Sequence, residues 1–400
     1  RYDEFMRMIR IWKHLMLLKR GGIGMLPGGV DSASRGSCAV ECPACPRELP
    51  TLDPASGSND PDDGDENNDD PPPPLFVMLD ANFRLKLKQR NLVDPPLGGG
   101  LAYFVEQAPY MSHVKSAGTQ TEVRLCIERR INGVNAEQIN VCDSGLHAID
   151  HANTRGGSAY AASGVGACQC RHMLVKSLGV GDLQKGEKYS NMDFIFSSAI
   201  RDITAKRLVV SYDIACQWHK NLRGRLEIMN PAYSPDIDSR AVDFVIPKFH
   251  IGAHGSSCQT RFSLNYRPHM GRTDGENIER GWAWLNPASL STREMGPGAR
   301  QDALDDQWSF WNWRIVVSLG TSKDNNGYYK ALTTSNSGNA LGRRFEDAVY
   351  YAREQRLSHT QFTATFKESQ VARWSSMVQD WYADPDAFDP FQEPETGMFG

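Results

Sequence analysis

The pattern of apolar and polar positions along the chain predicts an α/β protein. Residues 75–79, "LFVML", form an unbroken apolar run that stops at Asp80. The next stretch, "FRLKLKQ" at 83–89, alternates apolar and polar side chains with a period of two. This pattern is typical of β-strands, so the two stretches together predict a pair of antiparallel strands joined by a tight turn.

Further along, helical and strand patterns alternate. The stretches that show them are "NMDFIFSSAIRDITAK" (helix), "RLVVSYD" (strand), "CQWHKNLRGRLEIM" (helix), "FVIPKFH" (strand) and "GENIERGWAWL" (helix). Residues 97–187 are rich in glycine and carry no clear period, so they are expected to be a long insertion. The order of elements predicts a mixed sheet with flanking helices.

The two ends of the chain differ from this centre. Residues 2–19 have helical spacing and are followed by Cys42 and Cys45 in a C-x-x-C pair, which could be half of a zinc site, although no second pair follows at finger spacing. Residues 53–74 are acidic and rich in proline, which predicts a disordered linker. Amphipathic patterns from residue 345 predict a C-terminal helical part. The expected units are therefore 1–52, 53–74, a core at 75–320 that contains the insertion, and 321–400.

Composition limits the cellular compartments and the kinds of partner that can be expected. The formal net charge is −4 and the pI about 6.2, so no basic field covers the whole protein. The nine cysteines form no regular framework, which favours a reducing compartment, cytosol or nucleus, over disulfides. No apolar run approaches the length of a membrane span. The chain starts at Arg1 without a leader, so we expect a fragment of a longer protein.

Acidic residues stand where the predicted elements begin or end. Asp80 and Asp213 each close an apolar strand, and Glu276 and Glu279 open a helix after the last strand. Acids from separate elements can meet at the carboxyl edge of a sheet and bind two Mg²⁺ or Mn²⁺ ions, which is the ribonuclease H-like arrangement for cutting nucleic acid. Aspartates at strand ends are also common as turn and cap residues, and spacing alone leaves both interpretations open.

Several longer motifs carry a resemblance to a known family. They are "CPACP", "LDANF", "GVGDLQKGEKYSNMDFIF", "SYDIACQWHKN", "PKFHIGAHGSSCQ", "GRTDGENIERGWAWLNP" and "STREMGPGARQDALDD". In this order they resemble the Kyakuja-Dileera-Zisupton transposases of fungi, and in particular the subgroup with a cysteine-cluster domain upstream. The chain lacks that upstream module, and its acidic insertion at 53–74 departs from the family pattern.

The resemblance implies a ribonuclease H-like core with an Asp, Asp, Glu triad. Asp80 falls on the family's D-x-N-F strand and Asp213 on its Y-D-I-A-C-Q strand. "ERGW" around Glu279 is similar to the E-R-x-F that carries the glutamate of hAT transposases. Glu276 stays open as an alternative, because it lies three residues away on the same helix face.

Cys216 and His219 resemble the C-x-x-H that related transposases place behind their second acid. One helical turn separates them, so both can point at one zinc ion. Their partners remain open, and otherwise these side chains are simply buried and hydrogen-bonded. The candidate partners are His250, His254 and Cys258, or Cys142, Cys170 and His172.

The expected function is that of a nuclear DNA transposase that acts on double-stranded transposon ends and target DNA as a homo-oligomer, with no membrane. Two other interpretations stay open: a ribonuclease H-like nuclease with another purpose, and a non-catalytic DNA-binding or regulatory protein derived from a transposase. Trp282 and Trp284 could stack on a flipped base, although core packing is more common for such residues. The basic residues that could hold phosphates, or simply form a solvated face, are Lys220, Arg223, Arg225, Arg272 and Arg280.

Overall fold

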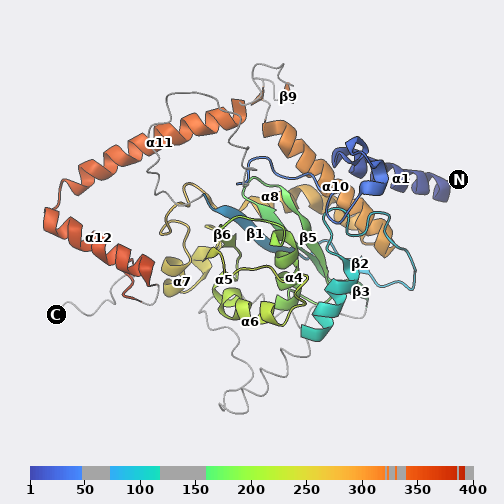
Figure 1. The fold of residues 1–400 in the computed structure, drawn as a ribbon, viewed down its shortest axis with the longest axis horizontal. Helices are drawn as coiled ribbons and strands as arrows, with labels where there is room; N and C mark the ends of the chain where they lie inside the picture. The colour runs from blue at the N-terminus through green and yellow to red at the C-terminus, as the bar shows by residue number, and fades with distance from the viewer. Residues whose placement is uncertain are drawn as a thin grey trace, which may run out of the picture.

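A mixed β-sheet lies at the centre of the molecule (Figure 1). It is seen in a computed structural model that describes residues 1–46, 73–117, 159–319, 322–323, 329–330, 339–384 and 387–391. Its five strands lie in the order β5-β4-β1-β6-β7. Their bounds are β1 Leu75–Asn82, β4 Gly164–Cys170, β5 Val175–Leu183, β6 Arg207–Ser211 and β7 Ala241–Val245.

The strand directions match a ribonuclease H-like arrangement. β1 pairs antiparallel with β4, which pairs antiparallel with β5, whereas β1, β6 and β7 are parallel to one another. The predicted mixed α/β fold is therefore confirmed. Because β1 has strands on both edges and helices on both faces, nearly all its side chains are buried, which explains its continuous apolar sequence.

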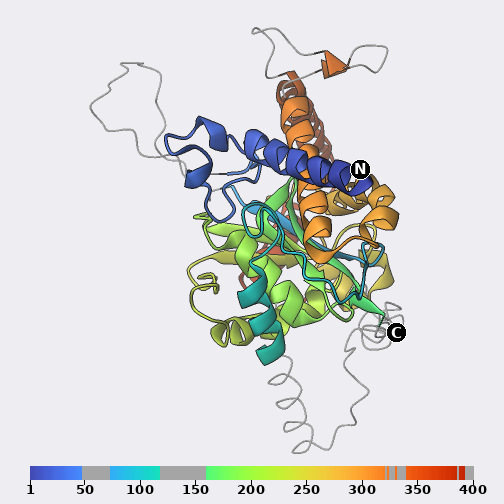
Figure 2. The same ribbon diagram turned by 90° about the vertical axis from the view of Figure 1, so that its right-hand side faces the viewer.

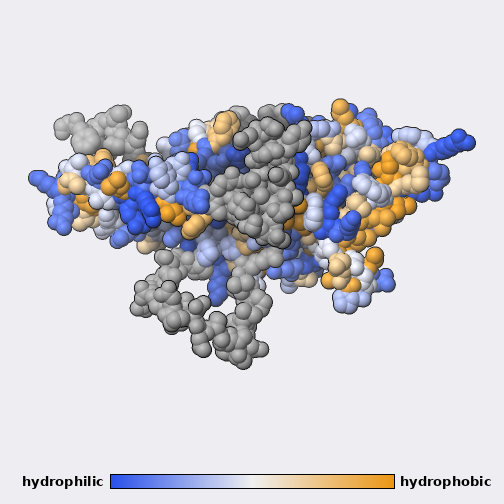
Figure 3. All heavy atoms as spheres, turned by 90° about the horizontal axis from the view of Figure 1, so that it is seen from above, coloured by the Kyte–Doolittle hydropathy of each residue, from blue (hydrophilic) through white to orange (hydrophobic). Residues whose placement is uncertain are grey.

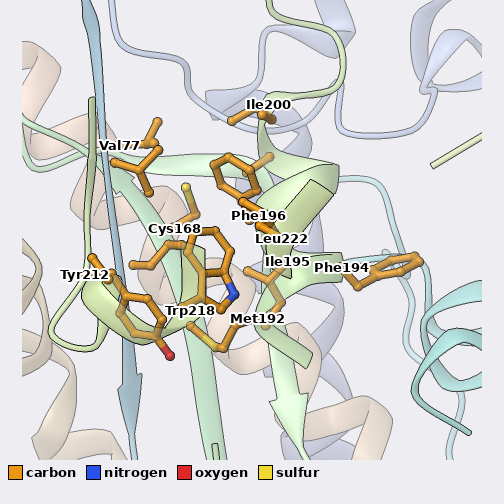
Figure 4. Close-up of a cluster of buried hydrophobic side chains, with 14 of the residues drawn as sticks. Val77, Cys168, Met192, Phe194, Ile195, Phe196, Ile200, Tyr212, Trp218 and Leu222 are labelled. Carbon is orange, nitrogen blue, oxygen red and sulfur yellow. The ribbon is translucent and has the colours of Figure 1, made fainter. Parts of the chain in front are cut away.

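One face of the sheet packs against helix α4 (Tyr189–Ile200). Leu75, Val77 and Leu79 point to this side, where they join a buried cluster with residues of α4 and with Trp218. Figure 4 shows Val77 and Cys168 of the sheet facing Met192 and Phe196 of α4, with the ring of Trp218 between them. This cluster is the larger part of the core and fixes the position of β1.

The other face packs against α8 (Asn277–Leu285), α10 (Pro297–Leu319) and α1 (Tyr2–Arg20). Met78 points to this side and contributes to a second buried cluster. Figure 2 shows α1 lying across α10. Ion pairs join the two helices: Arg10 Nε lies 2.6 Å from Asp302, and Arg20 Nη1 lies 2.8 Å from Asp306. The N-terminal helix is therefore packed onto α10.

Shorter elements complete the fold. They are η1 Ile23–Met25, η2 Gly29–Ser32, a helix at 107–117, β2 Leu87–Lys88, β3 Tyr160–Ala162, α5 Ala215–Trp218, η3 His219–Asn221, α6 Leu222–Glu227, η4 Ile251–Ala253, α7 Ser256–Arg261, η5 Asn286–Ala288, α9 Ser289–Thr292, β8 Ser322–Lys323 and β9 Tyr329–Lys330. The predicted hairpin at 75–89 is wrong, because β2 pairs with β3 instead. Both edges of β1 are already occupied by β4 and β6.

The stretch expected as an insertion, 97–187, contains two strands of the central sheet. Glycines obscured them. A Cβ on Gly166 would lie 2.8 Å from Met192 Sδ, and one on Gly181 would lie 2.9 Å from Ile195. Helix α4 thus approaches these strands so closely that a larger residue would require its side chains to shift. Glycine is favoured at the two positions, and the usual strand signal of β-branched side chains is lost. The prediction that the whole of 97–187 is an insertion is therefore wrong, because β4 and β5 belong to the central sheet.

Two helices form the C-terminal part, as predicted: α11 (Asn339–Thr363) and α12 (Glu368–Ala383). They extend to one side of the sheet in Figure 1, and Figure 3 shows apolar and polar residues interspersed along this arm. The buried Trp381 of α12 returns to the core, with the guanidinium of Arg267 over its ring. Residues 53–72 of the expected linker lie outside the described residues. In the described part of the chain, no helix combines the length and apolarity needed to cross a membrane.

Candidate active site

The strand directions bring the predicted acids to one edge of the sheet. Asp80 lies near the carboxyl end of β1, and Asp213 lies two residues beyond β6. These strands are parallel, with Met78 opposite Ser211, so both acids emerge at the same edge. β7 ends at this edge as well, and the chain that leaves it carries His250 and then leads to α8.

Asp80 is held by helix α8. Trp282 Nε1 donates a hydrogen bond of 2.6 Å to Asp80 Oδ2. Burial raises the pKa of Asp80 well above its ordinary value, and the negative charges of Asp213, Glu187 and Glu279 raise it further. The acids are therefore close enough to repel one another through a poorly solvated region.

Asp213 is paired with a histidine. His250 Nδ1 lies 3.0 Å from Asp213 Oδ2, and its Nε2 lies 3.9 Å from Glu276. The hydrogen bond that His250 donates to Asp213 raises the pKa of His250, against an opposing effect of burial. His250, expected as a zinc ligand, thus contacts the acidic site, where its protonated form would offset part of the negative charge.

Both candidate glutamates of α8 lie at the site, in different roles. Glu276 precedes the helix and accepts a hydrogen bond of 2.8 Å from the backbone N–H of Phe249. Glu279 lies in the first turn of α8, with its side chain open to solvent on one side. Partial burial and the charge of Asp213 raise its pKa, the charge of His250 opposes this, and the charge of Glu276 adds to it. Glu279 and Asp80 line the same cavity, whereas Glu276 is tied to the loop after β7.

A fifth acid, Glu187, was not identified from the sequence. It lies between β5 and α4 and accepts a short hydrogen bond from the hydroxyl of Tyr212. Burial, together with the charge of Asp213, raises its pKa to about 7, although the Tyr212 hydrogen bond opposes this. Glu187 follows a glycine-rich turn and ends no apolar run, so the only signal for it was its place in the motif "GVGDLQKGEKYS".

A cavity of about 440 Å³ opens beside Asp80. Its lining residues are Asp80, Ala81, Asn82, Phe83, Arg84, Lys86, Ser163, Glu279, Trp282 and Asn286. It therefore combines carboxylates, which suit hard divalent cations, with two basic side chains, which suit phosphate oxygens. Among the described residues, the acids do not form a set with all ligand atoms within 4.8 Å of one another.

A cluster of soft ligands lies behind Asp213. Cys216 Sγ is 3.6 Å from His254 Nδ1, and Cys258 completes a set whose ligand atoms lie within 4.8 Å of one another. His219 is placed outside this set. Its Nδ1 donates to the carbonyl of Ala215 at 2.7 Å, and burial lowers its pKa.

A second cluster joins the C-x-x-C pair to the end of β4. It consists of Cys42, Cys45, Cys170 and His172, so Cys170 and His172 do not partner Cys216. Cys142 lies outside the described residues. The seven cysteines that the structure describes form no disulfide. Both clusters could hold a structural metal such as zinc.

The other candidates are mostly structural. Trp282 is buried and bonded to Asp80, and Trp284 packs against Trp311 with ring centroids 5.7 Å apart. Arg225 is tied to the buried Asp193, with Nε 2.7 Å from its carboxylate. The remaining arginines have partners too: Arg223 pairs with Asp238, Arg280 with Asp274, and Arg272 lies over the ring of Tyr351.

Residues 73–312, more than half of the chain, match the family model of the Kyakuja-Dileera-Zisupton transposases. The chain belongs to this transposase family. The match contains every acid of the site and also Cys170 and His172, but it begins after Cys42 and Cys45. No similarity to a curated protein or to a solved structure was found. Membership of this family suggests a transposase role, with nuclease activity and DNA binding.

Proposed function

We propose that the chain is the catalytic region of a DNA transposase that cuts and joins transposon ends with two divalent cations. One observation carries this proposal: Asp80 lies among three further carboxylates whose charges raise its pKa, at the edge where parallel strands end. Such an excess of negative charge destabilises the folded protein unless cations offset it. Mg²⁺ or Mn²⁺ fits the carboxylate ligands.

Asp80, Asp213 and Glu279 would hold the two ions, which supply an activated water and stabilise the departing oxygen of a phosphodiester. Trp282 fixes the orientation of Asp80 through its hydrogen bond. His250 balances the charge of Asp213 before a cation binds, and Glu276 anchors the loop that carries His250. Glu276 remains the alternative third ligand.

DNA would enter beside the cavity. Arg84 and Lys86 line it together with Asp80, where they can contact phosphates flanking the cleaved bond. The proposal includes action in the nucleus on double-stranded transposon ends and target DNA, and assembly of a homo-oligomer on that DNA.

The test is divalent-dependent nicking of a labelled duplex that carries the terminal repeats of the encoding element, with a supercoiled plasmid as a sequence-independent probe. We expect Asp213→Asn to reduce cutting by at least about a thousandfold, because loss of a metal ligand removes several kcal/mol of stabilisation from the transition state. Asp238→Asn is the matched control, since Asp238 is exposed and pairs only with Arg223 among the contacts described here.

The outcomes separate the alternatives. Joining of the freed 3′-end to a second duplex distinguishes a transposase from a plain nuclease. Cutting by Asp213→Asn at the wild-type rate would refute the assignment. Tight binding of DNA without cleavage in either Mg²⁺ or Mn²⁺ would support a non-catalytic DNA-binding protein instead.

A further inference from the structure

Three sulfur atoms surround one imidazole nitrogen near the end of β4. The distances to His172 Nδ1 are 3.4 Å from Cys42 Sγ, 3.7 Å from Cys45 Sγ and 4.0 Å from Cys170 Sγ. All four ligand atoms lie within 4.8 Å of one another. The three thiols also hydrogen-bond to one another. Three thiols and one imidazole that converge on a common point form the donor set of a structural zinc site.

The spacing matches a tetrahedral zinc site. With Zn–S of about 2.3 Å and Zn–N of about 2.0 Å, a tetrahedral angle separates sulfur from nitrogen by about 3.5 Å. The observed distances scatter around this value, and the set supplies the Cys₃His ligands of a closed structural site. We propose that Cys42, Cys45, Cys170 and His172 bind one Zn²⁺ ion.

The ligands come from two distant parts of the chain. Cys42 and Cys45 follow the N-terminal helix, whereas Cys170 ends β4 opposite Val77 of β1, and His172 lies in the turn that leads to β5. Cys42 and Cys170 are 5% and 0% exposed, whereas Cys45 and His172 are half-buried, so the site is largely shielded from water. The ion fastens the N-terminal segment to the central sheet, and the functional unit begins well before the matched residues 73–312.

The same turn supports the active-site helix. The side-chain amide of Asn277, the first residue of α8, donates a short hydrogen bond to the carbonyl of Arg171, which lies between two of the ligands. The guanidinium of Arg171 also lies over the ring of Phe76 in β1, 4.7 Å from its centroid. The zinc site therefore positions the start of α8. A catalytic consequence of this positioning, through Glu279 in α8, rests on the proposed function. The proposal that the four residues bind zinc does not depend on it.

The first experiment measures zinc per chain in the purified full-length protein. The double variant Cys45→Ser/Cys170→Ser should lose one equivalent of zinc relative to wild type, whether or not the cluster at Cys216 holds another. His172→Cys should keep that equivalent, because it creates a Cys₄ site. Cys38→Ala and Cys168→Ala are matched controls: both thiols are buried and lie outside the cluster, so zinc content should not change.

Replacement of zinc by Co²⁺ gives an independent readout. Wild type should show sulfur-to-cobalt charge-transfer absorption that falls in Cys45→Ser alone, a milder change that keeps the other three ligands. Unchanged absorption in Cys45→Ser, or equal zinc content in wild type and the double variant, would overturn the proposal. So would loss of one equivalent in Cys38→Ala.

Hydrogen exchange tests the positioning of α8. Loss of zinc in the double variant should increase amide exchange at residues 277–281 at least tenfold, whereas Cys168→Ala should leave it unchanged. Unchanged exchange in the zinc-free variant would overturn the positioning role. Asp213→Asn should keep the full zinc content, so a protein that binds zinc but cuts no DNA would contradict only the proposed function.

Discussion

Replacing Glu187 by glutamine tests the electrostatics of the candidate site. The folded protein raises the pKa of Glu187 from 4.5 to about 7, mainly through burial. At about 1.4 kcal/mol per pH unit, this corresponds to about 3.5 kcal/mol. The pKa of Glu187 is higher in the folded than in the unfolded protein. The contribution of Glu187 to stability is therefore present in full below pH 4.5 and is lost as the pH rises through 7. Glutamine does not titrate, yet its carbonyl can still accept the hydrogen bond from Tyr212.

The assay is urea unfolding at pH 5 and pH 8.5 without added Mg²⁺ or Mn²⁺. The free energy of unfolding of Glu187→Gln, relative to wild type, should rise by about 2.5 kcal/mol between the two pH values. The exposed Glu227 provides the control, and Glu227→Gln should follow the wild-type pH dependence. Parallel pH profiles for wild type and Glu187→Gln would show that Glu187 ionises in the folded protein as it does in water, and the electrostatic reasoning would fail.

Two further substitutions probe the helix and the histidine of the site. Because Asp213 raises the pKa of His250, protonation of His250 should compete with cations, so Mg²⁺ affinity should fall as the pH decreases towards 6. In His250→Ala, Mg²⁺ affinity measured by thermal-shift titration should decrease less as the pH is lowered. A decrease equal to that of wild type would contradict competition between the proton on His250 and the cation. Gly281→Ala should destabilise by about 1–3 kcal/mol in urea, since its Cβ would lie 2.5 Å from Nε2 of the buried Gln169. In the control Gly224→Ala in α6, the added Cβ has no atom within 4 Å, so this substitution should stabilise the protein by up to about 1 kcal/mol. Equal effects of Gly281→Ala and Gly224→Ala would contradict the close packing of Gly281 against Gln169.

The part of the fold that was predictable is the part built from simple patterns. The apolar runs that end at Asp80 and Asp213 are buried strands, and their parallel directions place both acids at one edge. Helix α8 begins at Asn277, two residues after the predicted start at Gly275, so Glu276 precedes the helix and Glu279 lies in its first turn. Their catalytic role remains a prediction. Asp80, Asp213 and Glu279 do interact electrostatically in the folded chain.

The unpredicted parts depend on partners that are far away in the sequence. Helix α10 buries polar side chains that a sequence pattern assigns to the surface: Arg300 is fully buried, with Nη1 2.6 Å from Asp182 and Nη2 2.7 Å from the carbonyl of Leu85. The four residues of the proposed zinc site could not be grouped either, because Cys45 and His172 lie on opposite sides of a long intervening sequence. Only the folded sheet brings such residues together.

The central position of β1 has a consequence for how the protein is made. β1 leaves the ribosome long before either of its neighbours, because Val77 pairs with Cys170 on one side and Val210 on the other. At about 5–20 residues per second, it waits on the order of ten seconds with both edges unpaired. An apolar strand in that state readily joins other chains, so chaperone supply during translation should limit the yield of this protein.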